Sequence, residues 1–344
     1  MTLLPLPRIP DPLEAPAIRW GILGAGGIAT AFATAVSAFT RSQLVAVGSR
    51  DADRGQAFAS RFGIPKVYQS YDELVADAEV DAIYVATPHS HHLQHALLAI
   101  TAGKHVLVEK AFARNAAEAG LIVGAARSAN VTVMEAMWTR FLPRTDIVRQ
   151  LLQSGELGEI ITLIADHGQA LTHVPRLMQP DLAGGALLDL GIYPVSWTVF
   201  ALGMPTQIVA QAVPTETGVD GQITILLSGF QNHPRAHAVL TTTLWAQTPT
   251  TASLSGTKAS VELTGTPFYQ PGPVTLVDAD LVRTESAPSK LVAHQGLAYE
   301  AAHFAELVVG GQTESPLLPL DESVGILAIL DEARRQIGFK LPGE

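Results

Sequence analysis

The sequence predicts an α/β protein of two domains, in which a doubly wound parallel sheet is followed by an α+β domain with a large, mainly antiparallel open sheet. Apolar runs alternate with helical segments up to about residue 135, the pattern of strands and crossover helices in a parallel sheet. Beyond Pro143, several runs alternate apolar residues with Thr, Ser or Gln, which indicates an antiparallel sheet with one covered face. A length of 344 residues also favours two domains over one.

The first domain is expected at residues 18–137. Its first strand is the apolar run at residues 20–23, which leads directly into a glycine-rich turn and an alanine-rich helix. The other strands are short apolar runs and the helices have apolar residues at helical spacing: strands 44–47, 80–87, 105–109 and 131–135, and helices 51–62, 92–101 and 116–129.

The second domain is expected at residues 138–344, and its C-terminal helix is a candidate to pack back on the first domain. Residues 1–17 contain five prolines and few charges, so an extended arm is expected there, not a signal peptide. The elements expected in the second domain are a helix near 144–153, strand runs at 160–165, 208–213, 222–230, 236–244 and 252–263, and helices at about 299–310 and 321–337.

Composition excludes several classes of function. With 47% hydrophobic and 16% charged residues, the chain can bury sizeable cores. A net charge of -10 argues against nucleic acid or an anionic membrane as a partner. The absence of cysteine excludes disulfides and a thiol nucleophile and fits a cytoplasmic location. No apolar run is expected to reach the length needed to span a bilayer.

The glycine-rich turn after the first strand has the spacing of a dinucleotide fingerprint. Gly24, Gly26, Gly27 and Ile28 fall between the apolar run and the alanine-rich helix. In this context, glycines allow a tight turn and a close approach of the backbone, and the helix N-terminus attracts a pyrophosphate. The pattern therefore predicts a bound dinucleotide, although small residues at this spacing also serve ordinary turns.

The residues that end the second strand select the form of the dinucleotide. NAD sites place Asp or Glu there to accept hydrogen bonds from the ribose. This chain has Ser49 and Arg50 instead, and a hydroxyl with a guanidinium suits a 2′-phosphate. We therefore expect NADP in preference to NAD. The alternative is that Arg50 is a solvated arginine at the start of the next helix.

A second group of polar residues follows two parallel strands at their carboxyl ends, the edge where open α/β sheets bind ligands. Zinc is an alternative ligand for the histidines, but no carboxylate or thiol joins them at ligand spacing, and a nicotinamide explains their position. His91 and His95 are expected to be exposed on a helix. The residues expected to contact the cofactor are Thr87, Pro88, His89, His92, Glu109 and Lys110.

A third group lies in the second domain, in a segment with three glycines at 184–191. Asp189 and Tyr193 are four residues apart, so on a helix they project from one face. A buried tyrosine with a satisfied hydroxyl is the structural alternative for Tyr193. The glycines on either side favour a ligand site, because they let the backbone approach a ligand closely.

With these three motifs in order, the chain resembles the glucose-fructose oxidoreductase, inositol dehydrogenase and MocA family of NAD(P)-dependent oxidoreductases. The similarity covers nearly everything from Trp20 to Pro342, and the segment 135–143 is most similar to the branch with dimeric dihydrodiol dehydrogenase and NADP-dependent D-xylose dehydrogenase. The resemblance implies a Rossmann domain, an open sheet that mediates dimerisation, and Lys110 and Tyr193 beside the reacting C–O bond. One departure is Ala111, which replaces the family's proline.

The chemistry of such a site can be written from the residues. Oxidation of a carbinol needs a hydride acceptor and a base for the hydroxyl proton. The ordinary pKa of tyrosine, about 10, is too high for this role at neutral pH, and a lysine ammonium nearby would lower it. Tyr193 and Lys110 are therefore expected to act together, and Asp189 would orient Lys110 or substrate hydroxyls.

Three more residues are candidates for ligand contacts. Trp138 offers an apolar wall for a sugar face or an arene ring, and Arg140 and Arg176 are candidate contacts to cofactor or substrate. Each arginine has an ion pair as its structural alternative. The expected function is NADP-dependent oxidation or reduction of a sugar, sugar derivative or cyclic diol by a homodimer. The competing hypothesis is a catalytically idle NADP-binding regulatory or structural protein.

Overall fold

The computed structural model describes residues 4–344, which divide into two compact units. The parallel-sheet unit comprises Pro10–Phe141 and Ala293–Val324. The open-sheet unit comprises Leu142–Val292 and Gly325–Glu344, together with residues 4–9. These boundaries differ from a simple division near residue 138, because the segment Ala293–Val324 belongs with the first unit.

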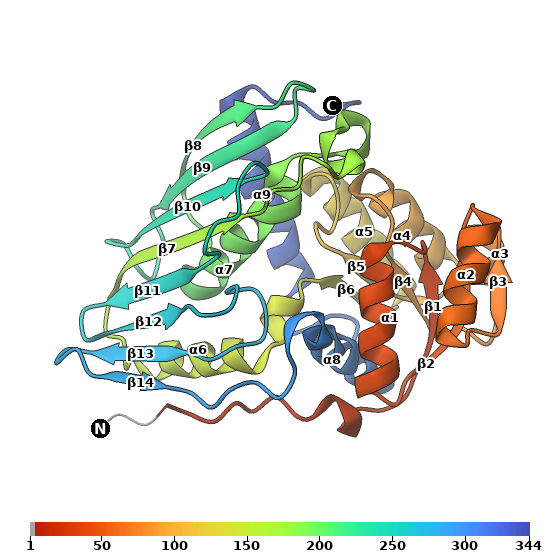
Figure 1. The fold of residues 1–344 in the computed structure, drawn as a ribbon, viewed down its shortest axis with the longest axis horizontal. Helices are drawn as coiled ribbons and strands as arrows, with labels where there is room; N and C mark the ends of the chain where they lie inside the picture. The colour runs from red at the N-terminus through yellow and green to blue at the C-terminus, as the bar shows by residue number, and fades with distance from the viewer. Residues whose placement is uncertain (1–3) are drawn as a thin grey trace. The chain divides into compact units, whose positions relative to one another are not determined.

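The parallel-sheet unit has the predicted doubly wound fold. Within residues 4–344 its sheet has six strands, all parallel, in the order β3-β2-β1-β4-β5-β6 (Figure 1). The order reverses at β1 and β4, and such a switch point is where open α/β sheets bind ligands. The strands are β1 (Arg19–Leu23), β2 (Gln43–Gly48), β3 (Lys66–Tyr68), β4 (Ala82–Val85), β5 (His105–Glu109) and β6 (Val133–Ala136).

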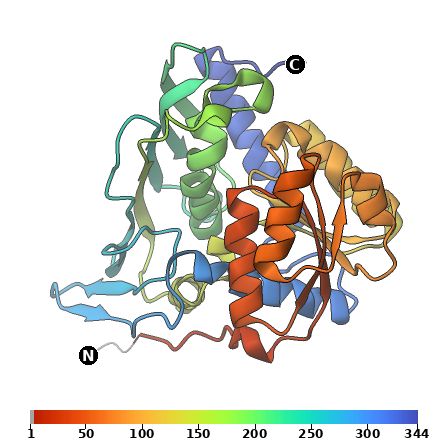
Figure 2. The ribbon, with the colours of Figure 1, turned by 45° about the vertical axis from the view of Figure 1, so that its right-hand side comes forward.

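Capping side chains mark where two helices of this unit begin. The Asp51 carboxylate accepts a hydrogen bond from the Arg54 N–H and caps α2, and the Asn115 side chain caps α5 in the same way. Figure 2 shows α1 lying beside the strands of the sheet. The helices are α1 (Gly27–Phe39), α2 (Ala52–Phe62), α3 (Tyr71–Ala76), α4 (His92–Thr101), α5 (Ala116–Ala129) and α8 (Leu297–Val309), with short turns η1 (Pro12–Glu14), η2 (His89–His91), η3 (Trp138–Phe141) and η7 (Ala293–Gly296).

An aromatic cluster explains why residues 293–324 belong to the parallel-sheet unit. Trp20 of β1 is fully buried, with its ring 5.3 Å from that of Phe32 on α1 and 5.2 Å from that of Phe304 on α8. Burial of aromatic side chains of this size contributes several kcal/mol to packing. The cluster joins segments almost three hundred residues apart, a pairing that local sequence patterns do not predict.

The open-sheet unit has the predicted large and mainly antiparallel sheet. Within residues 4–344 the sheet has eight strands in the order β14-β13-β12-β11-β7-β10-β9-β8, and β7 with β10 is its parallel pair. The run predicted at 252–263 is a hairpin of two strands. The strands are β7 (Ile160–Gly168), β8 (Gln207–Pro214), β9 (Asp220–Ser228), β10 (His237–Thr243), β11 (Ala252–Gly256), β12 (Ala259–Leu263), β13 (Thr275–Asp278) and β14 (Arg283–Glu285).

Helix α7 packs against β7 and β10 and covers one face of this sheet (Figure 1). Side chains therefore alternate along β9 between buried and exposed positions, as one covered face requires. The uncovered face carries exposed apolar side chains. The helices of this unit are α6 (Pro143–Ser154), α7 (Ile192–Leu202) and, from Gly325 on, α9 (Leu320–Ile337), with short turns η4 (Pro175–Met178), η5 (Pro180–Leu182) and η6 (Leu187–Gly191).

One expectation from hydropathy is wrong. The helical run Pro180–Leu202 has the length and mean hydropathy, 1.4, of a membrane span, whereas no such run was expected. Its apolar window is 94% buried inside the protein, as in the core helix of a folded domain.

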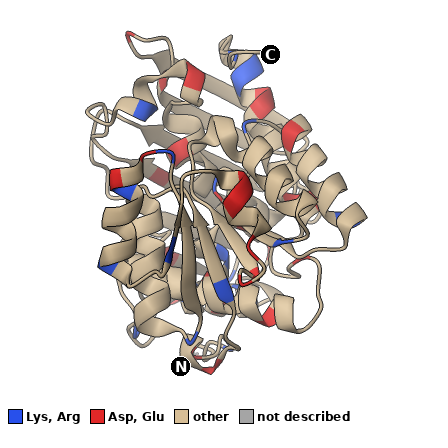
Figure 3. Cartoon of the chain, turned by 90° about the vertical axis from the view of Figure 1, so that its right-hand side faces the viewer, with Lys and Arg blue, Asp and Glu red and all other residues tan. Residues whose placement is uncertain are grey.

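Charged residues of both signs are scattered over the ribbon in Figure 3, and most of the chain is uncharged.

Candidate functional site

The glycine turn joins β1 to α1 and leaves room for a ligand. Gly24 has φ of 101°, and a Cβ there would lie 3.1 Å from the Ala86 carbonyl oxygen, so this position requires glycine. Gly26 and Gly27 are exposed, and a Cβ on either would meet no atom within 4 Å. Ile28 is half-buried beside them. Open backbone at a helix N-terminus fits a pyrophosphate, so these residues suit the dinucleotide that the motif predicts.

The two residues after β2 have different surroundings. Ser49 is buried, and its hydroxyl donates a 2.8 Å hydrogen bond to the Asp51 carbonyl. Arg50 is exposed at the same edge of the sheet as the glycine turn. A guanidinium in this position is available to an anionic group on a bound nucleotide.

The histidines after β4 hold the loop that follows β5. His89 Nε2 lies 3.2 Å from the Lys110 carbonyl oxygen, and His92 Nδ1 lies 2.8 Å from that of Ala111. His92 Nε2 also faces the Thr87 carbonyl oxygen at 2.7 Å. Burial lowers the pKa of His92 to about 4, although both carbonyl contacts act in the opposite direction. These two histidines therefore position the backbone around Lys110.

His91 ends the η2 turn, and His95 lies in the first turn of α4. His95 is 5% exposed, whereas it was expected on the surface, and its Nδ1 lies 3.0 Å from the Thr87 hydroxyl oxygen. His91 is half-buried. Thr87 and Pro88, both half-buried, complete the turn between β4 and η2. Within residues 4–344, no group of three His, Cys, Asp or Glu side chains could hold a metal ion.

Glu109 and Lys110 stand at the carboxyl end of β5. The buried Glu109 carboxylate accepts hydrogen bonds from the Tyr84 hydroxyl and from the Lys110 N–H. Lys110 is half-buried, and the peptide bond between Lys110 and Ala111 is cis. This end of β5 therefore presents one lysine side chain from a tightly bonded backbone.

Two more buried carboxyl groups lie near Glu109. Burial and the charges of Glu109 and Glu135 raise the pKa of Glu300 on α8 well above its ordinary value. Burial likewise raises the pKa of Glu135 to about 7, although the Ser323 hydroxyl and the Phe112 N–H donate to its carboxylate. Sequence reasoning missed Glu300, because an isolated acid in a helical segment carries no local sign of burial.

Trp138 and Arg140 lie in η3, and both are buried. The Trp138 ring stacks on that of His294 with 5.7 Å between centroids. The Arg140 guanidinium donates to the Glu322 carboxylate at 2.6 Å and to the Leu317 carbonyl. The structure thus gives Arg140 the ion pair that was its structural alternative.

In the open-sheet unit, Asp189 and Tyr193 lie in one continuous helical run. Asp189 belongs to the π-helical turn Leu187–Gly191, and Tyr193 to the first turn of α7. The Arg176 guanidinium donates to the Asp189 carboxylate at 3.0 Å, and Asp189 is 6% exposed. Arg176 is therefore placed to orient Asp189.

Gly184 and Gly185, which precede this run, pack closely against other groups of the protein. This packing explains why both positions are glycine without a bound ligand. A Cβ on Gly184 would lie 2.4 Å from the Leu177 carbonyl oxygen, and one on Gly185 would lie 2.1 Å from the Asp220 carboxylate. Gly185 also has φ of 115°. The Asp220 carboxylate accepts a hydrogen bond from the Leu187 N–H at 2.6 Å. Both glycines thus let the chain pass close to buried groups.

Tyr193 is part of an aromatic cluster that the sequence did not indicate. Its ring centroid lies 5.3 Å from that of His167 and 4.7 Å from that of Tyr269. Gln169 Nε2 lies 2.9 Å from His167 Nε2 and donates to the Tyr269 hydroxyl at 3.3 Å. Burial raises the pKa of Tyr269. His167 lies in β7, Gln169 follows that strand, and Tyr269 lies in a distant loop, so spacing in the sequence could not group them with Tyr193.

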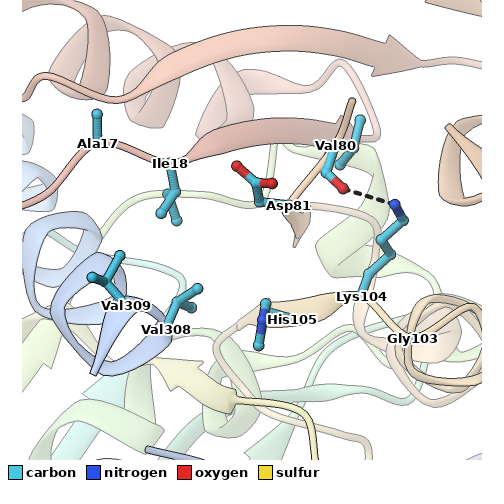
Figure 4. Close-up of a pocket in the computed structure, with 9 residues that line it drawn as sticks. All are labelled: Ala17, Ile18, Val80, Asp81, Gly103, Lys104, His105, Val308 and Val309. Carbon is cyan, nitrogen blue, oxygen red and sulfur yellow. Dashed lines mark hydrogen bonds between the residues drawn. The ribbon is translucent and has the colours of Figure 1, made fainter. Parts of the chain in front are cut away.

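A pocket of about 470 Å³ lies at the opposite, amino edge of the parallel sheet. The Lys104 ammonium donates to the Val80 carbonyl (Figure 4). It also donates to the Asp77 carbonyl, and Asp81 forms a bidentate pair with Arg19. The charged groups of this pocket, Lys104 and Asp81, are therefore already engaged in contacts within the protein. The pocket is lined by Ala17, Ile18, Val80, Asp81, Gly103, Lys104, His105, Val308 and Val309.

Two family models match this chain. The model described as an oxidoreductase family with an NAD-binding Rossmann fold matches residues 18–137. The model described as the GFO/IDH/MocA C-terminal domain matches residues 146–262. The first covers the glycine turn, Arg50, the histidines and Lys110, and the second covers Asp189 and Tyr193.

Curated relatives match over nearly the whole length. Trans-1,2-dihydrobenzene-1,2-diol dehydrogenase of Macaca fascicularis is 40% identical over 333 residues, which cover 95% of this chain and 98% of the relative. The protein of the same name from Homo sapiens is 39% identical over 341 residues, with the same coverage.

Solved structures match as well. KijD10, a 3-ketoreductase from Actinomadura kijaniata in complex with NADP and TDP-benzene, has a TM-score of 0.82 and 27% identity, covering 94% of this chain and 98% of its own. A levoglucosan dehydrogenase in complex with NADH and levoglucosan has a TM-score of 0.83 at 18% identity, with 93% and 98% covered. At that identity the second match shows the fold alone.

Proposed function

The chain belongs to the GFO/IDH/MocA family of NAD(P)-dependent oxidoreductases, and from that premise we propose that it is an NADP-dependent enzyme that oxidises or reduces a CH–OH carbon of a sugar, sugar derivative or cyclic diol. The observation that carries this proposal is the similarity to dihydrodiol dehydrogenases at 40% identity over 95% of the chain. The open glycine turn before α1 supports it with a place for the pyrophosphate.

The cofactor's adenosine end is proposed to lie against Arg50 and its nicotinamide end near Lys110. Arg50 is exposed after β2, and Thr87, His89 and His92 shape the neighbouring loop at the same edge. At this site NADP would supply the hydride acceptor for oxidation, and NADPH the hydride donor for reduction. The complex of KijD10 with NADP supports the choice of cofactor.

We propose that Lys110 and Tyr193 form the acid/base unit. In oxidation the Tyr193 oxygen takes the proton of the substrate hydroxyl, and in reduction it returns that proton to the carbonyl oxygen. The Lys110 ammonium stabilises the phenolate. KijD10 has also been solved with a lysine replaced by alanine and, separately, with a tyrosine replaced by phenylalanine, each in complex with NADP. Asp189, held by Arg176, is proposed to orient substrate hydroxyls, and Trp138 to contribute to substrate binding.

The test of this function is a panel of aldoses, ketoses and cyclic diols with NADP or NADPH, followed by nicotinamide absorbance. Turnover of one substrate class supports the proposal and names the class. NADP binding without turnover of any member would favour an idle regulatory or structural protein on the same fold. The two hypotheses differ in chemistry, not in nucleotide binding.

We expect the unmodified protein to use NADP at least about tenfold more efficiently than NAD, because a charge-assisted hydrogen bond to the 2′-phosphate is worth roughly 1.5–3 kcal/mol. Arg50→Ala should bring the ratio of the two kcat/KM values close to one. Ser49→Asp should reverse it, since a carboxylate repels the phosphate and accepts from a free 2′-hydroxyl. Arg61→Ala, at the other end of α2, is the matched control. Equal use of both cofactors by the unmodified protein would contradict the assignment.

The uncovered face of the open sheet is proposed to join two copies of the chain. Val209, Leu226, Val239 and Ile164 are paired in register across β8, β9, β10 and β7 and are 36–59% exposed. A continuous apolar row of this kind marks an interaction surface. Exposed apolar residues elsewhere, such as Leu281 in the turn after β13, stand outside the row.

We expect a homodimer at micromolar concentration, and we expect Val239→Asp to give monomers, because the carboxylate would be desolvated in the interface. Light scattering measures both. Leu281→Asp is the control, and its assembly should equal that of the unmodified protein. A monomeric unmodified protein would refute this interface.

A further inference from the structure

A row of three rings runs along the carboxyl edge of the parallel sheet. The Tyr71 and His95 rings meet edge to face at 4.8 Å, and the His95 and His91 rings stack at 5.5 Å with an interplanar angle of 23°. Tyr71 packs against Gly48 at the end of β2, where a Cβ would lie 3.0 Å from its ring. The row therefore begins at the strand that leads into Arg50.

The middle ring of the row is linked to the glycine turn through Thr87. His95 Nδ1 lies 3.0 Å from the Thr87 hydroxyl oxygen, and the Thr87 methyl group lies 3.1 Å from where a Cβ on Gly24 would stand. His91, the last ring, is half-buried, and its Nδ1 lies 2.8 Å from the Ser90 hydroxyl oxygen. That contact uses Nδ1 and leaves Nε2 as the ring nitrogen for a ligand.

The charged groups around His91 are basic. Burial and the positive charge of Arg50 both lower the pKa of His91. Its other titratable neighbours are His92, on which it acts by charge, and His95, on which it stacks. Within residues 4–344, none of the groups that shift the pKa of His91 is a carboxylate. The nearby Asp51 is paired with Arg54 at 3.4 Å. Basic groups that repel one another in this way are stabilised by a bound anion.

We propose that His91 determines specificity for NADP, binding the 2′-phosphate together with Arg50 and taking up one proton from solvent as it does so. This inference rests on the proposed function, since it needs the nucleotide at this edge. A phosphate monoester carries a charge of about -1.5 to -2 at neutral pH and offers strong acceptor oxygens. Imidazolium Nε2–H then donates to a phosphate oxygen, and no covalent bond changes.

The direction of the pH dependence follows from the charges. In the free protein, burial and Arg50 favour neutral His91, and a bound dianion favours the charged form. Between the pKa of the free protein and the higher pKa of the complex, binding takes up a proton, so affinity for NADP rises as pH falls. The second pKa of the 2′-phosphate, about 6, acts in the opposite direction. Protonation of the phosphate affects a His91 variant equally. The ratio of the NADP affinities of the two proteins at each pH therefore reports the contribution of His91 alone.

The experiment measures dissociation constants for NADP and NAD by titration calorimetry, on the full chain and on His91→Gln. Near pH 6, His91→Gln should weaken NADP binding roughly tenfold, and near pH 8.5 by less than about threefold. NAD binding should be equal in both proteins, which also shows that the variant is folded. Proton uptake, measured in two buffers of different ionisation enthalpy, should be lower in the variant. His173→Gln, at an exposed histidine of the open-sheet unit, is the matched control.

The other possible results decide between failure of this inference and failure of the proposed function. A pH-independent loss in His91→Gln, or no loss, overturns the inference. Equal weakening of NADP and NAD also overturns it, because His91 would then contact a part that both nucleotides share. If the unmodified protein binds neither nucleotide, the proposed function itself fails. If it binds and uses NADP with no contribution from His91, the proposed function stands and this inference alone fails.

Discussion

Tyr193→Phe is expected to lower turnover about a hundredfold or more, the usual scale for loss of general acid–base assistance. The variant keeps the ring that packs against His167 and Tyr269 and loses only the oxygen that carries the proton. Lys110→Met is expected to cost as much, because the phenolate loses its stabilising charge. NADP binding should survive Tyr193→Phe, and Lys110→Met should weaken it only modestly. Steady-state kinetics and nucleotide titration check these expectations.

The two losses should not add. In the double variant, turnover should be little lower than in the worse single variant, as is typical of residues that share one chemical step. Tyr269→Phe is the matched control, since it removes a hydroxyl from the same aromatic cluster, and it should keep turnover within about tenfold. If the losses multiply, or if Tyr193→Phe retains most of its turnover, the proton takes another route. His92 is then a poor substitute, because both its ring nitrogens face backbone carbonyls, and Asp189 becomes the better candidate.

Arg144→Met is expected to lower the free energy of unfolding by about 3–5 kcal/mol, because it leaves several buried acceptors without a donor. Arg144 is 1% exposed. Its guanidinium donates to the Thr266 hydroxyl oxygen and to the carbonyl oxygens of Pro267, Gln270 and Pro273 at 2.9–3.2 Å. Arg144→Lys should recover less than half of the loss, since an ammonium lacks the planar fork.

Urea unfolding measures the effect on stability, and turnover measures its consequence for the site. The loop that Arg144 holds carries Tyr269, whose ring lies 4.7 Å from that of Tyr193, so turnover should fall in the folded variant too. Arg235→Met is the control: its ion pair with Glu159 is exposed and screened by solvent, so this variant should unfold at nearly the same urea concentration as the unmodified protein. An Arg144→Met protein with the stability of the unmodified protein would show that the loop does not depend on this side chain.

Local patterns predicted some elements to the residue and missed others. Helices α4 and α5 and strand β5 have the predicted bounds, because apolar periodicity and capping residues such as Asn115 act over a few positions. Short elements such as β3 and α3 were missed, since three to six residues carry too little periodicity. The run at 252–263 forms a hairpin with its turn at Thr257 and Lys258, and the Ser255–Gly256 signal beside that turn was overlooked within the alternating apolar pattern.

The sequence by itself determined the doubly wound sheet, the glycine turn at residues 24–27, the basic residue after β2 and the presence of Lys110, Asp189 and Tyr193. These follow from residue identity and from spacing over one or two turns of chain. The tertiary structure decided which groups meet: Phe304 with Trp20, His89 and His92 with the backbone around Lys110, Gly185 with Asp220, and Tyr193 with His167 and Tyr269. Such contacts depend on packing and burial between segments distant in the chain, and no local pattern records them.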